Sequence, residues 1–135
     1  MGSVIHLEGV KVSREISSEQ MAVYRATARQ RHQQKVRDLA LRHQRAWVVA
    51  KQASQLLKEQ FGAERVAVFG SVLSDRRFHQ RSDVDLAVWG LDEKVYYRAV
   101  SRLLDLDTTI SVDLIETELA PPALQAIIER EGVTL

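Results

Sequence analysis

The stretch FGSVLSDRRFHQRSDVDLAVWG, residues 69–90, decides the fold of this chain. An apolar run ends in the pair Gly70-Ser71, and a second apolar run begins at the pair Asp83-x-Asp85. Two apolar runs joined by a polar loop predict two strands of one sheet. Because side chains alternate between the faces of a strand, Asp83 and Asp85 are predicted to share one face while their apolar neighbours face the core.

A third carboxylate, Asp113, stands in another alternating run, SVDLIE at residues 111–116. Its apolar neighbours are predicted to face the core, which leaves Asp113 on the opposite face. Neighbouring carboxylates repel one another unless a proton or a cation lies between them. Mg²⁺ takes oxygen ligands and is usually held by one or two carboxylates together with substrate phosphates. If the two strands are neighbours, Asp83, Asp85 and Asp113 meet the requirement of a two-metal phosphoryl-transfer site, in which the ions lie about 3.5 to 4 Å apart.

The Gly-Ser pair, the Asp-x-Asp pair and Asp113 on a later strand together resemble the DNA polymerase beta type nucleotidyltransferase superfamily. The pattern is most similar to its minimal nucleotidyltransferase (MNT) domains, many of which are encoded beside a helical HEPN partner as antitoxin and toxin. Kanamycin nucleotidyltransferase, poly(A) polymerases and CCA-adding enzymes share the motif more distantly. The resemblance covers residues 66–133, and the loop at residues 72–82 is one residue longer than is usual in the superfamily.

The resemblance implies a Mg²⁺-dependent transfer of AMP from ATP to a tyrosine hydroxyl of a HEPN toxin, so that this chain acts as the antitoxin. Asp83 and Asp85 are then expected to bind the Mg²⁺ that bridges the triphosphate, and Asp113 to join them at a second ion and activate the acceptor hydroxyl. The residues expected to bind the nucleotide are Gly70, Ser71, Arg81 and Ser82.

Each part of this motif also has a structural explanation. A Gly-Ser pair after a strand is most often only a turn, and an aspartate at a strand entrance often caps the strand or is simply solvated. Of the loop arginines, Arg81 is preferred as a phosphate ligand over Arg76 and Arg77 because it lies next to the Asp-x-Asp pair, although all three could remain in water. His79 is interpreted as a bystander and Trp89 as a packing residue.

Composition limits the class of protein. A length of 135 residues predicts one catalytic domain without a separate substrate-binding domain. No stretch approaches the ~20 apolar residues of a membrane helix, and residues 1–12 lack the pattern of a secretory signal, so a cytoplasmic location is predicted. The absence of cysteine excludes disulfides, thiolate nucleophiles and cysteine-ligated metal sites.

Charge is distributed unevenly along the chain. Residues 1–51 carry ten Lys and Arg against four Asp and Glu, whereas residues 52–135 carry nine against fourteen. The basic part of the chain, residues 25–45, is suited to nucleic acid or to an acidic protein surface, and a solvated helix face explains it equally well. These differences predict an amino-terminal arm and basic helix at residues 1–45 and a nucleotidyltransferase domain at residues 46–135.

Helical signals surround the motif. Ser17 and Gln20 predict a capping box at the start of a helix. No Gly or Pro follows before Gly62, so the segment between them is predicted to be helical, either as two helices or as one long helix. A helix is predicted after Asp92, and another after the pair Pro121-Pro122. The predicted fold is therefore α/β (α+β), with a small mixed sheet, helices packed against it and a long amino-terminal helical segment.

Other functions compete with protein nucleotidylation. The chain could neutralise a toxin by complex formation alone, without catalysis. It could modify a small molecule in the manner of the aminoglycoside enzymes, for which a homo-oligomer or a partner would have to complete the acceptor pocket. Addition of nucleotides to nucleic-acid ends is supported only by the basic helix.

Overall fold

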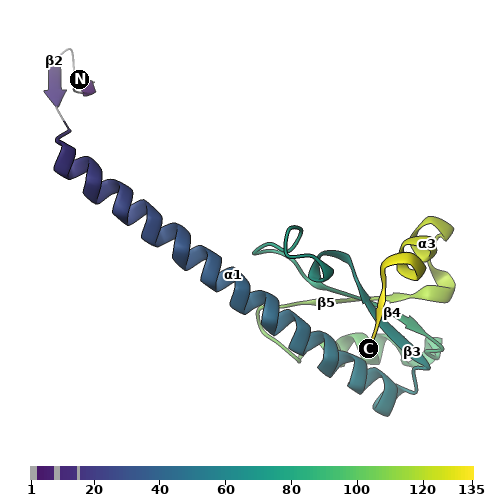
Figure 1. Cartoon of the computed structure of the whole chain (residues 1–135). Coiled ribbons are helices and arrows are strands. Elements are labelled where there is room, and N and C mark those ends of the chain that lie inside the picture. Colours follow the sequence, from purple (N-terminus) through teal and green to yellow (C-terminus); the bar gives the residue numbers. More distant parts are fainter. Residues whose placement is uncertain (1–2, 8–9, 15) are drawn as a thin grey trace. The chain divides into compact units, whose positions relative to one another are not determined.

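The computed structural model describes residues 3–7, 10–14 and 16–135 (Figure 1). These residues belong to two compact units, Met1–Asp38 and Leu39–Leu135. The helices and strands, in chain order, are β1 (Ser3–Leu7), β2 (Val10–Arg14), α1 (Ser18–Phe61), β3 (Arg65–Phe69), β4 (Val84–Trp89), α2 (Tyr96–Leu104), β5 (Val112–Glu116), α3 (Pro122–Glu131) and β6 (Val133–Thr134).

The segment predicted as either two helices or one long helix is a single helix of 44 residues, α1. The predicted capping box is present at its start: the Ser17 N–H donates to Gln20 Oε1 at 2.9 Å, and the Gln20 N–H donates to Ser17 Oγ at 3.1 Å. These two bonds satisfy amide groups that have no partner within the helix. At the other end Gly62 adopts a φ of 72°, the left-handed conformation that commonly ends helices.

In the unit Met1–Asp38, β1 and β2 form an antiparallel hairpin, with Ser3 opposite Arg14 and Leu7 opposite Val10. Residues 1–2, 8–9 and 15 of the predicted amino-terminal arm lie outside the described residues. The portion of α1 that belongs to this unit is exposed at every position except Met21 and Ala26, which are half-buried.

In the unit Leu39–Leu135, four strands form one mixed sheet in the order β5-β4-β3-β6 (Figure 1). β3 pairs antiparallel with β4 and with β6, whereas β4 pairs parallel with β5. The chain crosses from β4 to β5 through α2, as a parallel connection requires. The predicted small mixed α/β sheet is therefore confirmed.

Alternation along the strands gives this sheet two different faces. Val66, Val68 and Leu86 belong to a core that also contains buried residues of α1 and α2. The opposite face carries a smaller cluster in which Phe69 and Ala87 meet side chains of α3. The buried residues that α1 and α2 contribute are Ala46, Val49, Ala50, Ala53, Leu57, Ala99 and Leu103. Among the described residues, no helix has the length and apolar content needed to cross a membrane.

Candidate active site

The two carboxylate-bearing strands are direct neighbours. β4 and β5 run parallel, and Asp85 lies opposite Asp113 in their register. Val84, between the two aspartates of the Asp-x-Asp pair, is fully buried and belongs to the core on the other face. Asp83 stands immediately before β4. The condition stated from the sequence, that the two strands be neighbours, is therefore met, and Asp85 and Asp113 lie side by side.

Gly70 brings the Gly-Ser pair against the same carboxylates. β3 places Phe69 opposite Asp85, and Gly70 follows at a φ of 79°. A Cβ atom added to Gly70 would lie 2.3 Å from Asp85 Oδ2, inside any allowed contact distance. The Asp85 carboxylate thus occupies the space above the Gly70 Cα, and a side chain at position 70 would displace it. The short 3-10 helix Gly70–Leu73 begins at this point.

The environment of Asp85 raises its pKa to about 6. Burial is the largest cause, because it disfavours the charged form, and the charges of Asp113 and Asp83 add to it. A hydrogen bond to the Asp113 side chain acts in the same direction. Three carboxylates therefore act on one another at this edge of the sheet, and a cation would relieve their repulsion.

A hollow of about 400 Å³ adjoins the paired carboxylates. Its lining combines the two acidic groups with aromatic and aliphatic side chains, the mixture that is common in small-molecule sites. The Tyr96 hydroxyl donates to the Leu114 carbonyl at 3.0 Å, which holds the ring at the wall of the hollow. The lining residues are Phe69, Asp85, Tyr96, Val100, Val112, Asp113, Leu114, Ile115 and Leu124.

The family model described as "Polymerase beta, Nucleotidyltransferase" matches residues 51–135, which include all three aspartates and the Gly-Ser pair. The chain belongs to this nucleotidyltransferase family. None of the curated proteins matches it in sequence.

Two solved structures show the same fold as this nucleotidyltransferase. A mutant of the toxin–antitoxin pair MntA–HpeT is 20% identical, covers 63% of this chain and 70% of its own, and has a TM-score of 0.52. A toxin–antitoxin structure with AMP-PNP is 24% identical, covers 59% of this chain and 66% of its own, and has a TM-score of 0.50.

The carboxylates of this nucleotidyltransferase suit a magnesium ion that is shared with a nucleotide. In the described part of the chain, no group of three or more His, Cys, Asp or Glu side chains is arranged so that it could hold a metal ion by itself. Mg²⁺ does not require such a group, because it commonly takes one or two carboxylates and completes its shell with water and substrate phosphates. Burial and the neighbouring charges of Asp113 and Asp83 raise the pKa of Asp85, and the carboxylate oxygens there are the hard ligands that Mg²⁺ prefers.

The side chains of the loop between the Gly-Ser pair and the Asp-x-Asp pair differ in their exposure and in their contacts. The Arg77 guanidinium donates from Nη2 to the Gly70 carbonyl at 3.3 Å, so this arginine reaches the Gly-Ser pair. Arg81, which the sequence favoured, is exposed, and its main-chain N–H donates to His79 Nδ1. Ser82 is buried, and its hydroxyl accepts from the His79 N–H at 2.9 Å. No sequence pattern favoured Arg77, because its contact with Gly70 depends on how the loop folds back.

Helix α1 supplies site contacts that were not expected from the sequence. The His43 ring stacks on Phe78 with centroids 4.3 Å apart, and its Nε2 lies 2.6 Å from the Val72 carbonyl. Its Nδ1 lies 3.2 Å from Asp75. The only sequence signal was that His43 continues the helical spacing of the buried alanines of α1. Arg42, from the same turn, bonds to the segments that carry the aspartates.

Asp107 organises the turn that leads into β5. Its side chain, only 10% exposed, accepts from Arg45 Nε at 2.7 Å and from the Thr109 and Ile110 N–H groups at 2.8 and 2.9 Å. The bond from Arg45 and those from the turn hold the pKa of Asp107 well below its usual range. This carboxylate is therefore structural, and it supports the entry to the strand that carries Asp113.

Replacing Asp107 with alanine is expected to lower the free energy of unfolding by about 2 kcal/mol, because several bonds to a charged acceptor are lost. A group whose pKa is lowered on folding stabilises the protein above its unfolded value of about 3.9, and this contribution disappears as the pH falls. Urea unfolding of the wild type and the variant should therefore differ most at pH 7. The difference should begin to shrink as the pH falls below about 3.9, and it should vanish only below the lowered pKa of the folded state. The exposed Asp105→Ala variant is the control, and an equally large loss there would contradict the assignment.

Replacing Asp85 with asparagine is expected to stabilise the metal-free protein at pH 8 by about 1 kcal/mol, after discounting for partial exposure. Because folding raises the pKa of Asp85 to about 6, the charged form opposes folding, and wild-type stability falls as the pH rises through this range. At pH 4 the gain should vanish, because the carboxyl is then protonated in the folded state. Urea unfolding in EDTA measures both, and a destabilised variant at pH 8 would contradict the repulsion inferred here.

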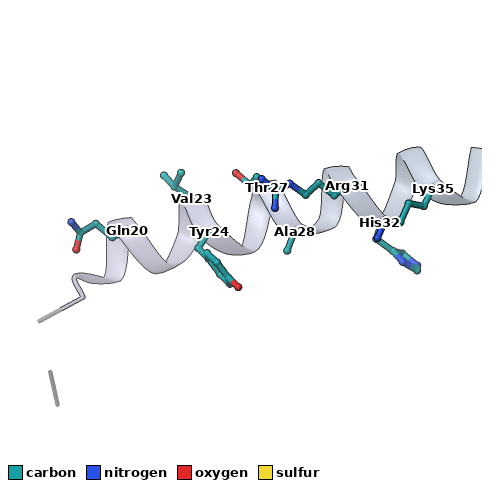
Figure 2. A pocket seen from close by; sticks show the side chains of 8 residues that line it. All are labelled: Gln20, Val23, Tyr24, Thr27, Ala28, Arg31, His32 and Lys35. Atoms are coloured by element: carbon teal, nitrogen blue, oxygen red, sulfur yellow. The ribbon is translucent and has the colours of Figure 1, made fainter. Parts of the chain in front are cut away.

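A larger hollow, of about 530 Å³, lies on the exposed part of α1, and none of its described lining residues carries a carboxylate (Figure 2). Its described lining comes from one helix, with side chains at helical spacing. Tyr24 and Val23 are 71% and 67% exposed there, beside two basic side chains. The lining residues are Gln20, Val23, Tyr24, Thr27, Ala28, Arg31, His32 and Lys35. Its described lining residues differ from those of the hollow beside Asp85 and Asp113.

Proposed function

We propose that this chain transfers AMP from ATP to a hydroxyl of a partner protein, a tyrosine of a HEPN toxin, and so acts as an antitoxin. The observation that carries the proposal is the pairing of Asp85 with Asp113 on adjacent parallel strands, with Gly70 packed against the Asp85 carboxylate. A strand entrance that merely needed capping would not require two facing carboxylates and a glycine without room for a Cβ.

Each group at the site has a role in this reaction. Asp83, Asp85 and Asp113 would hold two Mg²⁺ ions together with the triphosphate, and these ions would supply neutralisation of the triphosphate charge and a lower pKa of the acceptor hydroxyl. Asp113 receives the proton from that hydroxyl. The acceptor oxygen bonds to the α-phosphorus in line with the bond that breaks, and pyrophosphate leaves with that electron pair. Positioning and charge neutralisation therefore supply most of the rate enhancement.

The nucleotide lies beside the Gly-Ser pair in this proposal. Gly70 has no Cβ, so triphosphate oxygens can approach its main chain closely. The half-buried Ser71 hydroxyl is a donor for these oxygens. Arg81 and Ser82 complete the expected set at the other end of the loop, and Arg77 adds a cation beside Gly70. A similar fold in a toxin–antitoxin structure with AMP-PNP supports an adenine nucleotide as the substrate.

In this proposal, residues 1–45 contact the partner, and residues 46–135 carry the catalytic groups. The family model begins at residue 51, which supports a catalytic part without the amino-terminal segment. The exposed basic and apolar side chains of α1 in Figure 2 suit an acidic protein surface. The toxin–antitoxin structures of similar fold support a toxin as the partner.

The experiment is to co-express the chain with the product of the adjacent reading frame, which the proposal identifies as a HEPN protein, and to analyse that product by intact and tandem mass spectrometry. We expect one or more added AMP groups on tyrosine, and no addition in a strain that carries the Asp113→Asn variant. The matched control is Asp105→Asn, which removes an exposed carboxylate from the turn before the same strand. An unmodified HEPN protein, recovered from cells in which its toxicity is suppressed, would overturn the proposal.

Neutralisation by binding alone is the second candidate, and the exposed Val23 and Tyr24 on α1 favour it. The two candidates differ in their dependence on the carboxylates. Under the binding proposal, the Asp113→Asn chain still suppresses toxicity as well as the wild type. Under the catalytic proposal, the same variant forms the complex but no longer protects the cell during prolonged expression.

A further inference from the structure

Arg42 of α1 bridges the two segments that carry the catalytic aspartates. Its Nη2 donates to the Ser82 carbonyl and its Nη1 donates to the Thr109 carbonyl, both at 3.0 Å. Ser82 directly precedes Asp83, and Thr109 lies four residues before Asp113. One planar guanidinium thus joins main-chain groups that are far apart in sequence and belong to both halves of the site.

The bridge lies where the sheet stops holding these segments together. The Val84 N–H donates to the Ser111 carbonyl at 2.9 Å, at the beginning of the β4–β5 pairing. Ser82 and Thr109 come before this point, so their carbonyls are joined by Arg42 and not by a strand partner. Asp83 stands between the bridge and β4, outside the strand itself. Without the bridge, the strand entrances are free to separate, and Asp83 can move relative to Asp85 and Asp113.

The burial of Arg42 indicates that this arrangement is costly for the fold. Its Nε is buried and, among the described residues, has no hydrogen-bond partner. Burying part of a charged group with an unsatisfied donor disfavours folding. The rigid fork of an arginine suits two carbonyls at once, whereas the single ammonium group of a lysine is a point donor on a flexible stem.

We propose that Arg42 is a positioning residue, which fixes the strand entrances so that Asp83 and Asp113 are held at the separation that metal-assisted nucleotidyl transfer needs. The effect of Arg42 on the transfer rate rests on the proposed function. The fixing of the two segments is a property of the chain alone and is measured without nucleotide. The hydrogen bonds of Arg42 go to the main-chain carbonyls of Ser82 and Thr109, so it acts through these two segments and is not a catalytic residue.

The structural test is amide hydrogen exchange on the full chain without nucleotide or metal, for wild type, Arg42→Ala, Arg42→Lys and Lys51→Ala. Lys51 is the matched control, because it is an exposed cation on the same helix. We expect the Val84 amide to exchange at least about tenfold faster in both Arg42 variants, while the β3 amides and the Lys51→Ala chain stay at the wild-type rate. Unchanged exchange at Val84 in Arg42→Ala, or equal acceleration throughout the sheet, overturns the proposal.

The kinetic test compares transfer rates after correction for the folded fraction of each variant. Misplacement of reacting groups by about 1 Å is able to reduce the rate about 100-fold, so we expect kcat to fall at least tenfold in Arg42→Lys with the KM for ATP nearly unchanged. If Arg42→Lys keeps the wild-type kcat, transfer does not require one side chain that bonds to both carbonyls, and the proposal is overturned. If the wild type itself transfers nothing, the proposed function fails, and the exchange result alone still decides whether Arg42 fixes the two segments.

Discussion

The double variant Asp83→Asn, Asp85→Asn is expected to lose at least roughly 1,000-fold in the rate of nucleotidyl transfer, since removing a single preorganised electrostatic contact already lowers rates by about 100- to 1,000-fold. Asparagine keeps the size of the side chain but removes the negative charge that holds a metal–triphosphate complex. The rate is measured as AMP incorporated per folded chain at saturating ATP and Mg²⁺. The double variant should still bind its partner, because neither side chain contributes to the exposed surface of α1.

The control for this variant is Asp105→Asn, which removes one exposed carboxylate between α2 and β5. It should retain the wild-type rate. Two results would contradict the account: a double variant that retains transfer, or a control that loses it to a similar degree. The metal-free double variant should also be at least as stable as the wild type at pH 8, because the repulsion that raises the pKa of Asp85 is reduced.

Gly70→Ala is expected to have the second largest effect, with a loss of about 2 kcal/mol in stability and at least about 100-fold in transfer rate. An L-residue at a φ of 79° is strained, and the new Cβ would lie 2.3 Å from Asp85 Oδ2. The backbone or the carboxylate must therefore move. Thermal unfolding and initial rates measure the two losses separately.

Gly62→Ala is the matched control for the strain at position 70. Gly62 has a φ of 72°, but nothing lies within 4 Å of an added Cβ, so this variant carries the backbone strain without the collision. It should lose about 1 kcal/mol and keep its activity. In an Asp85→Ala background, Gly70→Ala should destabilise less than in the wild type, because the colliding carboxylate is absent. Equal activity losses at both glycines would show that the contact with Asp85 is irrelevant to transfer.

The strands and the face on which each carboxylate lies were predictable because they depend on local periodicity, whereas the pairing of β4 with β5 was stated from the sequence only as a condition. Alternation placed Asp85 and Asp113 opposite the apolar face, and burial of Val84 and Leu114 enforces that register. A shift of one residue would turn the aspartates toward the core, so the pattern excludes a one-residue slip. The capping box at Ser17 was likewise readable, since its bonds join residues three positions apart.

The supporting contacts were not predictable from the sequence, because they join side chains to main-chain carbonyls far along the chain. Arg42 reads as one basic residue among several, and only the packing of α1 on the sheet brings it to Ser82 and Thr109. His43 reads as part of an apolar stripe. A main-chain acceptor has no residue type, so no sequence pattern marks it. Arg81 was preferred over Arg77 because it is nearer to the Asp-x-Asp pair in sequence. Nearness in sequence does not determine how a loop folds, so the contact of Arg77 with Gly70 was not predicted.

The most direct test of the central claim follows the two ends of the triphosphate in one reaction. The purified chain and its HEPN partner are incubated with Mg²⁺ and ATP labelled either at the α- or at the γ-phosphate. The account predicts that the α-label appears on the partner while the γ-label is released as pyrophosphate, and that both events disappear in Asp113→Asn. Transfer of the γ-label, or a stable complex in which neither label moves, would contradict nucleotidyl transfer by these carboxylates.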